Sequence, residues 1–197
     1  MTGRDMDVEE IVHIALLDKP YYDASGGGVT LSGGEPTVQW EFAREILRRL
    51  KAECVHTAIE TSLSAGYASI EALLPYLDVL YCDIKLLDEE AHRKYTGKSN
   101  ADILENLVRV AATGKNITIH TPLIPGITDS DDNIRGIAQW IQANIPNAGY
   151  ELLNYNPLAE AKWQDLGKAY LPGKCSMLSK ERLDALYDVI HQVRQDA

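Results

Sequence analysis

Hydrophobic positions along the chain follow two different periods. Short apolar runs, bounded by glycine or polar residues, predict buried strands. We expect these strands at 29–31, 55–60, 79–85, 117–122 and 150–154. Between them, apolar residues recur every three or four positions, which is the spacing of a helix that buries one face. We expect helices at 7–19, 38–52, 69–77, 88–95, 102–112, 129–145 and 179–193.

The order of these elements predicts the fold class. Strands alternate with helices, and helical crossovers between short apolar strands imply an α/β fold with a mostly parallel sheet and right-handed connections. A partial or complete β/α barrel and an open doubly wound sheet both fit this pattern. The 197 residues suffice for one domain with a sizeable core. We expect loops at 21–28 and 156–175, and the second is long enough to be a lid or a partner surface.

Composition excludes two classes of partner. The formal net charge of −10 argues against nucleic acid, because phosphate binding needs a basic surface. No apolar run approaches the length of a membrane span and the N-terminus has no signal-peptide pattern, so we expect no membrane partner. Cys54, Cys82 and Cys175 are too widely spaced for a disulfide framework or a cysteine metal site. A cytoplasmic location is the simplest expectation.

The stretch from Val29 to Pro36 joins a short strand to a glycine turn. Gly33 and Gly34 allow a ligand to approach the backbone closely, since neither has a Cβ atom. Pro36 suits the first turn of the helix that follows. Glu35 and the exposed N–H groups of the turn therefore meet at the carboxyl end of a strand, where ligands bind in α/β folds. An ordinary strand-to-helix turn is the alternative interpretation.

Polar residues also stand at the carboxyl ends of the other strands. They are Glu60, Thr61, Asp83, Lys85, His120 and Asn156. Such a set suits a ligand with an amine, a carboxylate and hydroxyls, and its acidic oxygens could hold a cation. The alternative is internal pairing, in which Lys85 neutralises Asp83 or Glu60. His120 fits a pocket wall as well as it fits a ligand contact.

Five blocks of the sequence together match a known family. They are Ala24–Pro36, His56–Thr61, Asp83–Lys85, Pro122–Gly126 and Leu152–Leu158. In this order and spacing they resemble the radical S-adenosylmethionine (SAM) activating enzymes of glycyl radical enzymes, the group that includes the activating enzymes of pyruvate formate-lyase. The resemblance covers nearly the whole chain, and five ordered blocks are far more specific than a single Gly-Gly-Glu.

The resemblance implies a partial β/α barrel of the radical SAM type, related to the TIM barrel, with residues 1–197 as a single domain that binds SAM. In this family the Gly-Gly-Glu turn holds the methionine amino group, which assigns Gly33, Gly34 and Glu35 to the cofactor. The Asp-x-Lys strand end contacts the ribose and carboxylate region. That motif corresponds to Asp83, Ile84 and Lys85.

The resemblance also suggests further ligand residues. A monovalent cation beside the SAM carboxylate would fall on Glu60, Thr61, Asp83 and the backbone of Tyr81. The last polar contact to SAM would fall on Asn156. We include His120 among the cofactor-binding residues, although many members have arginine at this position.

Members of the family bind a [4Fe–4S] cluster through a Cys-x-x-x-Cys-x-x-Cys loop, and this pattern does not occur in the 197 residues. We expect the loop and the first β/α unit to precede residue 1, so we assign no catalytic residue and no iron–sulfur ligand within the chain. Because iron–sulfur clusters need thiolate ligands, we predict that these residues alone cannot cleave SAM reductively.

The function implied by the resemblance is that of an oxidoreductase. The full-length enzyme would use a 5′-deoxyadenosyl radical to abstract a glycine hydrogen from a partner such as pyruvate formate-lyase, under anaerobic conditions. A flavodoxin or ferredoxin-type protein would donate the electron, and the present chain would be the SAM-binding portion. The alternative is a cluster-free module that binds SAM, a nucleotide or a partner protein and has no radical activity.

Overall fold

The computed structural model describes residues 4–156 and 175–195. They fall into two compact units. The first unit consists of Met1–Cys82 and Asp102–Thr118, and the second consists of Asp83–Ala101 and Ile119–Ala197. The chain therefore leaves the first unit at the end of one strand and returns to it through a helix.

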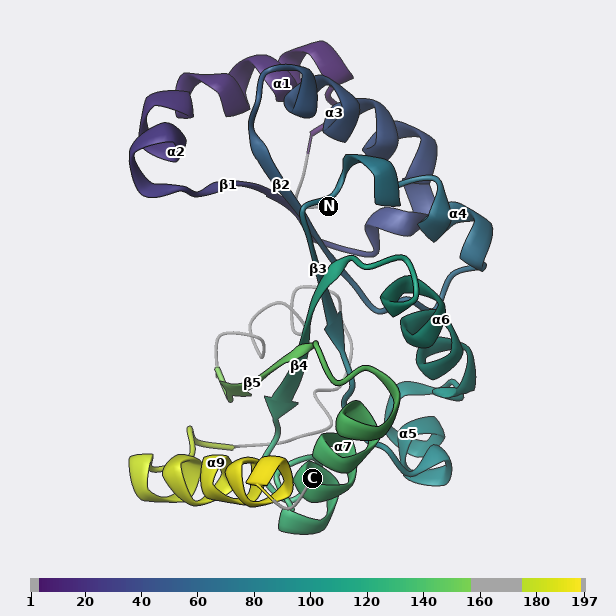
Figure 1. The fold of residues 1–197 in the computed structure, drawn as a ribbon, viewed down its shortest axis with the longest axis vertical. Coiled ribbons are helices and arrows are strands. Elements are labelled where there is room, and N and C mark those ends of the chain that lie inside the picture. Colours follow the sequence, from purple (N-terminus) through teal and green to yellow (C-terminus); the bar gives the residue numbers. More distant parts are fainter. Residues whose placement is uncertain (1–3, 157–174, 196–197) are drawn as a thin grey trace. The chain divides into compact units, whose positions relative to one another are not determined.

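A parallel sheet forms the centre of the first unit (Figure 1). Strand β1 (Gly28–Leu31) pairs with β2 (His56–Thr61), and β2 pairs with β3 (Val79–Asp83). The register places Leu31 opposite Ile59 and Thr61 opposite Cys82. The carboxyl ends of β1 and β2 consequently lie side by side, as the sequence predicted for a parallel sheet.

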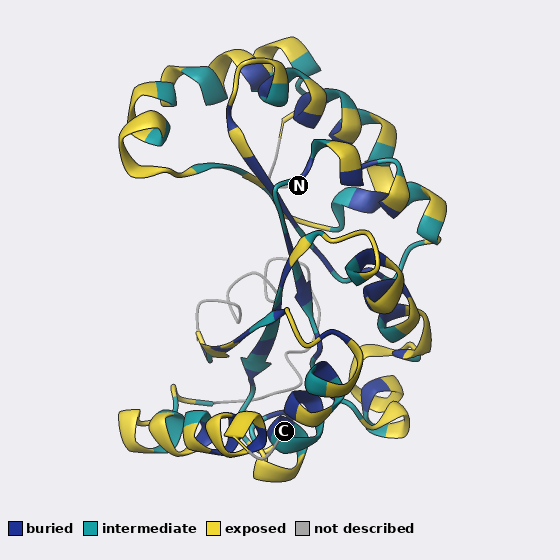
Figure 2. Cartoon of the chain, viewed as in Figure 1, coloured by how far each residue is buried: buried dark blue, intermediate teal, exposed yellow. Residues whose placement is uncertain are grey.

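Amphipathic helices surround these strands. In chain order the helical elements are α1 (Val8–Leu17), α2 (Lys19–Ser25), the 3-10 helix η1 (Pro36–Gln39), α3 (Trp40–Ala52), α4 (Tyr67–Glu71), the 3-10 helix η2 (Leu74–Tyr76) and α6 (Ala101–Ala111). In Figure 2 the buried residues of α3 and α6 lie on one side of each helix. Helices α1 and α3 contact each other, and Val12, Ile46, Leu50 and Val55 form a buried cluster with them.

The segment before β1 differs from the prediction. We expected Pro20 to end the first helix and residues 21–28 to form a loop, but α2 occupies Lys19–Ser25. Proline is tolerated in the first turn of a helix, where its missing N–H costs no hydrogen bond, so Pro20 lies at the start of a helix instead of ending one. The helix ends at Gly26, whose φ of +70° is left-handed.

Gly28 is needed for a different reason. A Cβ atom at this position would lie 1.9 Å from the carbonyl oxygen of His56 on the neighbouring strand. Strand β1 therefore starts at a point where the two backbones approach more closely than any side chain would permit.

The second unit contains α5 (Glu89–Thr96), α7 (Asp131–Asn144), β5 (Gly149–Asn154) and α9 (Lys180–Gln195). Strand β4 (Asn116–Leu123) begins in the first unit and continues into the second, where it neighbours β5. Helix α9 packs on α7, and the backbone N–H of Arg182 donates to the Ser179 hydroxyl at 3.2 Å. That bond confirms the N-cap predicted at Ser179. The predicted loop 156–175 lies almost wholly outside the described residues.

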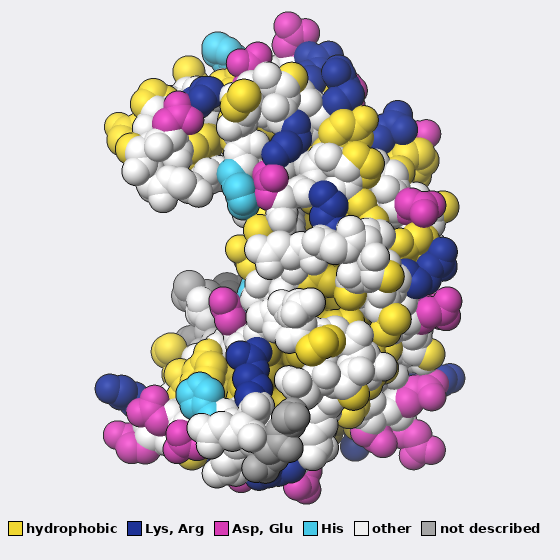
Figure 3. All heavy atoms as spheres, in the orientation of Figure 1, with side chains coloured by type: hydrophobic (Ala, Val, Ile, Leu, Met, Phe, Trp, Pro, Cys, Tyr) yellow, Lys and Arg dark blue, Asp and Glu magenta, His cyan; other side chains and the backbone are white. Residues whose placement is uncertain are grey.

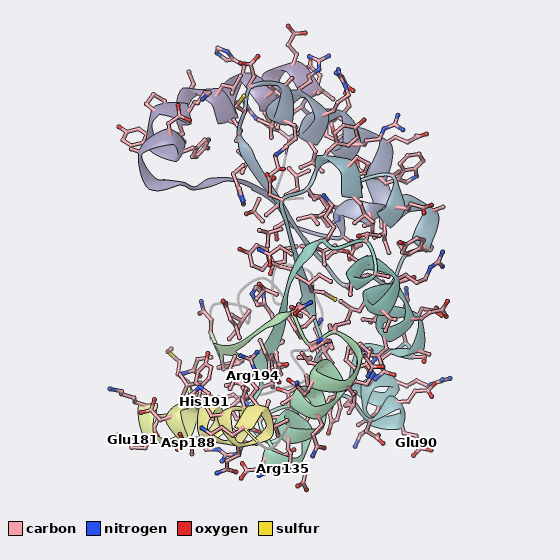
Figure 4. All side chains as sticks on the ribbon, in the orientation of Figure 1. Glu90, Arg135, Glu181, Asp188, His191 and Arg194 are labelled. Atoms are coloured by element: carbon pink, nitrogen blue, oxygen red, sulfur yellow. The ribbon has the colours of Figure 1, made fainter. Side chains whose placement is uncertain are left out.

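On the face drawn in Figure 3, Lys and Arg side chains are interspersed with Asp and Glu side chains. Two of the histidines outside the predicted site have ordinary surroundings. His191, labelled on α9 in Figure 4, is exposed, and buried His92 is hydrogen-bonded through Nδ1 to the Lys98 carbonyl at 2.8 Å. None of the helices in the described part of the chain has the length and apolar character that crossing a membrane requires.

Candidate functional site

The glycine turn after β1 is the first half of the predicted site. Gly33 has a φ of +117°, which a residue with a Cβ atom rarely adopts. Gly34 has an ordinary φ, and a Cβ atom built on either glycine would meet nothing within 4 Å. The backbone of this turn therefore faces open space, and glycine is needed at 33 for its conformation but not at 34.

Glu35 ends the turn, and both oxygens of its carboxylate accept hydrogen bonds. Oxygen Oε1 accepts hydrogen bonds from the Thr37 hydroxyl at 2.6 Å and the Thr61 hydroxyl at 2.6 Å. It also accepts from the backbone N–H of Thr37 at 3.2 Å, which makes Glu35 the N-cap of η1. Oxygen Oε2 accepts from the backbone N–H of Ser62 at 2.8 Å and from its hydroxyl at 2.6 Å. The carboxylate thus ties β1 to the end of β2.

These hydrogen bonds determine the ionisation of Glu35. Burial on its own would raise the pKa of this carboxyl, but the bonds from Ser62, Thr37 and Thr61 outweigh burial and lower the pKa. The group is therefore ionised at neutral pH, and hydroxyl and amide dipoles stabilise its negative charge locally.

Glu60 and Thr61 end β2 next to this turn. The Ser32 hydroxyl donates to Glu60 at 2.5 Å, so both strand ends are linked by side chains. Beyond them, Leu63 has a φ of +52°, an uncommon value for a residue with a side chain. Asn106 on α6 holds this strained segment by donating to the carbonyls of Leu63 at 2.9 Å and Ala65 at 3.1 Å.

The carboxyl end of β3 forms the second half of the predicted site, in the second unit. Asp83 is its last residue, and Lys85 Nζ lies 2.9 Å from Asp83 Oδ2. Both side chains are about one-third exposed, at 34% for Lys85 and 27% for Asp83. Between them Ile84 is buried, with 2% of its surface accessible. The internal pairing of Lys85 with Asp83, one of the alternatives from the sequence, is therefore present.

The backbone after Asp83 is bonded to side chains. Thr121 donates to the Ile84 carbonyl at 2.7 Å, Asn133 donates to the Lys85 carbonyl at 3.0 Å, and the Ile84 N–H donates to the His120 carbonyl at 3.0 Å. Asn100 donates to the carbonyls of Leu86 and Leu87 at 3.1 and 2.8 Å. Side chains, together with this main-chain bond to β4, thus hold the irregular segment.

His120 and Asn156 complete the predicted set in the second unit. The side chain of His120 is 12% exposed, and its Nε2 lies 3.5 Å from a carboxylate oxygen of Glu151. Asn156 follows β5 and is exposed. The backbone of His120 is adjacent to Ile84 through the bond described above.

Two groups emerge when each unit is taken by itself. The first unit brings together Gly33, Gly34, Glu35, Glu60 and Thr61, and the second brings together Asp83, Ile84, Lys85 and the backbone of His120. Sequence reasoning did not single out Thr37, Asn100 or Asn133 as supports for these groups. For Asn133 the sequence did contain a signal. This residue lies in the first turn of α7, where asparagine side chains often bond to backbone groups.

Comparison with known proteins identifies the family. The sequence model of the radical SAM superfamily matches residues 1–137. The chain is 39% identical over 170 residues to the (2S)-3-sulfopropanediol dehydratase activating enzyme of Klebsiella oxytoca, which covers 85% of this chain and 54% of that protein. It is 36% identical over 174 residues to the pyruvate formate-lyase-activating enzyme of Staphylococcus epidermidis, covering 85% of this chain and 69% of the relative.

A solved structure agrees with these relatives. A domain of the pyruvate-formate lyase-activating enzyme from Bacteroides vulgatus superposes with a TM-score of 0.70 at 26% identity, over 85% of this chain and 95% of that one. The predicted fold class, a mostly parallel α/β fold of the radical SAM type, is confirmed. The chain spans about half the length of the Klebsiella relative. It belongs to the radical SAM superfamily, within the family of activating enzymes of glycyl radical enzymes.

Proposed function

We propose that this chain is the SAM-binding part of an activating enzyme that generates a glycyl radical on a partner enzyme. The observation that carries the proposal is the open Gly33-Gly34 turn beside an ionised, fully bonded Glu35, in a chain whose relatives are activating enzymes. SAM and a [4Fe–4S] cluster are the cofactors of this superfamily, and together they supply radical chemistry that side chains cannot perform.

The first unit offers a fit for the amino acid end of SAM. The space in front of Gly33 and Gly34 lets an ammonium group approach the backbone of the turn, and the negative charge of Glu35 favours a cation there. Because the Glu35 oxygens already accept bonds from Thr37, Thr61 and Ser62, we assign the direct contacts to the glycine backbone and a supporting, electrostatic role to Glu35.

The second unit offers groups for the rest of the molecule. Asp83 can accept hydrogen bonds from ribose hydroxyls, and Lys85 can attract the SAM carboxylate. Ile84 is buried and would fix the positions of its two neighbours. His120 and Asn156 remain proposed contacts to the same ligand.

A monovalent cation at Glu60, Thr61 and Asp83 also remains a proposal. The oxygens of Glu60 and Thr61 are hard ligands. Glu60 accepts a bond from Ser32, and the Thr61 hydroxyl donates to Glu35 and accepts from the Leu63 N–H, so each residue keeps a lone pair for a cation.

Cys54 and Cys82 do not fit a shared iron–sulfur cluster. Cys82 lies opposite Thr61 at the carboxyl end of its strand, whereas Cys54 precedes β2 at the other end. The six residues of β2, which extend about 20 Å, lie between Cys54 and the strand end beside Cys82. Cys54 and Cys82 therefore cannot share one cluster, and we derive no step of the reaction through it. We expect these 197 residues alone to be unable to cleave SAM.

The remaining parts of the proposal concern the whole enzyme. Its protein substrate would be a glycyl radical enzyme, its electron donor a flavodoxin or ferredoxin-type protein, and its location the cytoplasm, with no nucleic acid or membrane partner. We also propose that both units belong to one domain spanning residues 1–197. The superfamily match supports this, because it runs through residues of both units.

Titration calorimetry of the chain with SAM tests the proposal. We expect saturable binding that is weakened when Lys85 is replaced by alanine. Lys51→Ala is the matched control, because Lys51 makes an ion pair of the same kind with Asp78 at 2.8 Å, with 34% of its side chain exposed. Absence of binding at high SAM concentration, or equal weakening by both variants, would refute the proposed site.

A cluster-free binding module is the second candidate, and the placement of Cys54 and Cys82 favours it for the isolated chain. Anaerobic reconstitution with iron and sulfide separates the two candidates. A stoichiometric cluster that supports 5′-deoxyadenosine formation would show that the chain is catalytically complete and that our assignment of the cysteines is wrong. Binding of SAM without a cluster is the result that we expect.

A further inference from the structure

The segment Ile84–Leu87 is unusual in how its backbone is satisfied. It follows β3 directly and has no regular secondary structure. Its consecutive carbonyl groups accept hydrogen bonds from side chains, at Ile84 from Thr121, at Lys85 from Asn133 and at Leu86 and Leu87 from Asn100. The donors come from β4, from α7 and from the residue before α6, so three separate parts of the chain converge on four residues.

Asn133 is the most fully used of these donors. Its Oδ1 accepts from the Leu87 N–H at 3.1 Å, and its Nδ2 donates to the carbonyls of Lys85 at 3.0 Å and Thr128 at 2.9 Å. Both amide protons and the amide oxygen are therefore engaged. No other side chain of similar size could make all of these bonds, because aspartate lacks the protons and leucine lacks every polar atom.

A second buried residue, Tyr150, holds the hydroxyl of Thr121 in place. Its hydroxyl has one proton, which it gives to the Ile84 carbonyl, so in its 3.1 Å contact with Tyr150 the tyrosine hydroxyl must be the donor. Burial raises the pKa of Tyr150, against the opposing effect of the Thr121 bond, and keeps that proton in place. Tyr150 and Thr121 thus form a short buried relay of hydrogen bonds that ends on the segment.

The arrangement determines where two charged side chains project. Ile84 is buried, whereas the side chains of Asp83 and Lys85 are partly exposed and meet at 2.9 Å, so these two side chains lie on the same side of the backbone. Fixing the carbonyls of residues 84 and 85 fixes the peptide planes on both sides of the Lys85 Cα atom. With those planes fixed, the long lysine side chain starts from a single direction and has fewer arrangements to lose when a ligand binds.

We infer that Thr121, Asn100 and Asn133 are positioning residues of the SAM site, acting through the backbone of Ile84–Leu87 to hold Lys85 in its ligand-binding direction. The inference rests on the proposed function. The inference goes beyond the proposed function, because it makes the SAM affinity of this strand end depend on side chains for which no contact with SAM is proposed.

The test is a set of SAM affinities measured by titration calorimetry on the full chain. Thr121→Val keeps the shape of the side chain but removes the donor, and Asn133→Ala removes the bonds to Lys85 and Leu87. We expect each to weaken SAM binding about tenfold, the effect of one or two lost hydrogen bonds. Thr121→Ser keeps the hydroxyl and should restore affinity to within about twofold of wild type.

Two controls come from α7 itself. Asn144 is exposed and bonds only to the Trp140 carbonyl of the same helix among the contacts described, so Asn144→Ala should leave SAM affinity unchanged. Ile141 is 3% exposed in the core, so Ile141→Val lowers thermal stability without touching the segment. Equal loss of affinity in Ile141→Val and Asn133→Ala would overturn the inference, because destabilisation alone would then account for it.

A double-mutant cycle separates positioning from general structural support. If Asn133 acts through Lys85, Asn133→Ala should weaken SAM binding in the wild-type background and cause little further loss in the Lys85→Ala background. Fully additive losses would overturn the inference. If the wild-type chain itself shows no SAM binding, the proposed function fails first, and the inference that rests on it falls with it.

Discussion

The Gly-Gly-Glu turn after β1 and the Asp-Ile-Lys end of β3 are the two predicted halves of the ligand site, and they are stabilised in opposite ways. In the turn, the charged side chain of Glu35 is held by hydroxyl and amide groups, while the glycine backbone faces open space. At the end of β3, the backbone is held by Thr121 and Asn133, while the charged side chains bond to each other and stay partly exposed.

If both regions bind SAM as we propose, the difference means that a charged residue in a motif need not be the group that contacts the ligand. In the turn, the side chain builds the structure and the backbone is left available. At the strand end, other side chains hydrogen-bond to the backbone, and the charged side chains are left available. Replacing the charged side chain should therefore affect stability in the first region and affinity in the second.

Replacing Glu35 should have the largest effect on stability. Glu35→Ala leaves the Thr37, Thr61 and Ser62 donors without their acceptor, and we expect a loss of about 3 kcal/mol in the free energy of unfolding. Urea denaturation measures it, with the exposed Glu41→Ala as a control. A variant that lost SAM affinity but kept its stability would show that Glu35 contacts the ligand and would break the comparison.

The two glycines of the turn should separate stability from affinity. Gly33→Ala must adopt a φ near +117°, and we expect it to cost about 1–2 kcal/mol of unfolding free energy. Gly34→Ala should change that free energy by less than about 0.5 kcal/mol, because its Cβ meets nothing within 4 Å. The same methyl group projects into the proposed ligand space, so calorimetry should detect weaker SAM binding. Unchanged affinity in Gly34→Ala would remove the turn from the site.

The pH dependence of stability should report on the Glu35 carboxylate. Its pKa is lower in the folded chain, so the ionised form stabilises the fold above its unfolded pKa of about 4.3, and this contribution is lost as the pH falls through the folded pKa. The difference in unfolding free energy between wild type and Glu35→Gln should therefore be constant from pH 7 to pH 6 and narrow below about pH 4. Asp78, whose pKa is also lowered, is present in both proteins and cancels in the difference. A difference independent of pH would contradict the ionised state of Glu35.

Removing Lys85 should have the smallest effect on stability. An ion pair with about one-third of each side chain exposed contributes less than about 1 kcal/mol, so Lys85→Ala should unfold almost like wild type. Its effect should appear in SAM affinity. A large loss of stability would mean that Lys85 supports the fold, and the contrast between the two regions would disappear.

Much of this architecture follows from local patterns in the sequence. Strand positions and the cap at Ser179 are set by neighbouring residues, so a window of a few positions is enough to predict them. The helix at Lys19–Ser25 was missed because Pro20 is compatible with both the end and the start of a helix. The observed helix places Tyr22 against the cluster of Val12, Ile46, Leu50 and Val55, a contact that includes residues far along the chain.

The supports of the site were not predictable in the same way. Asn133 bonds to Leu87, which is 46 positions away, and Thr121 bonds to Ile84, which is 37 positions away. Such pairs are created by the topology, and no periodicity marks them. Motif residues such as Glu35 and Lys85 could be located from the sequence, but whether the side chain or the backbone would be available could only be decided from their hydrogen-bond partners.

The discontinuous first unit has a consequence for synthesis on the ribosome. Leu63 and Ala65 emerge first, and the Asn106 amide that satisfies their carbonyls follows 43 and 41 positions later. At about 5–20 residues per second, this interval lasts roughly 2–9 s. During that time the carbonyl groups of Leu63 and Ala65, which follow Glu60 and Thr61 in the chain, lack the Asn106 amide as their donor. Translation speed through residues 66–105 therefore sets the delay before α6 completes this side of the proposed ligand site.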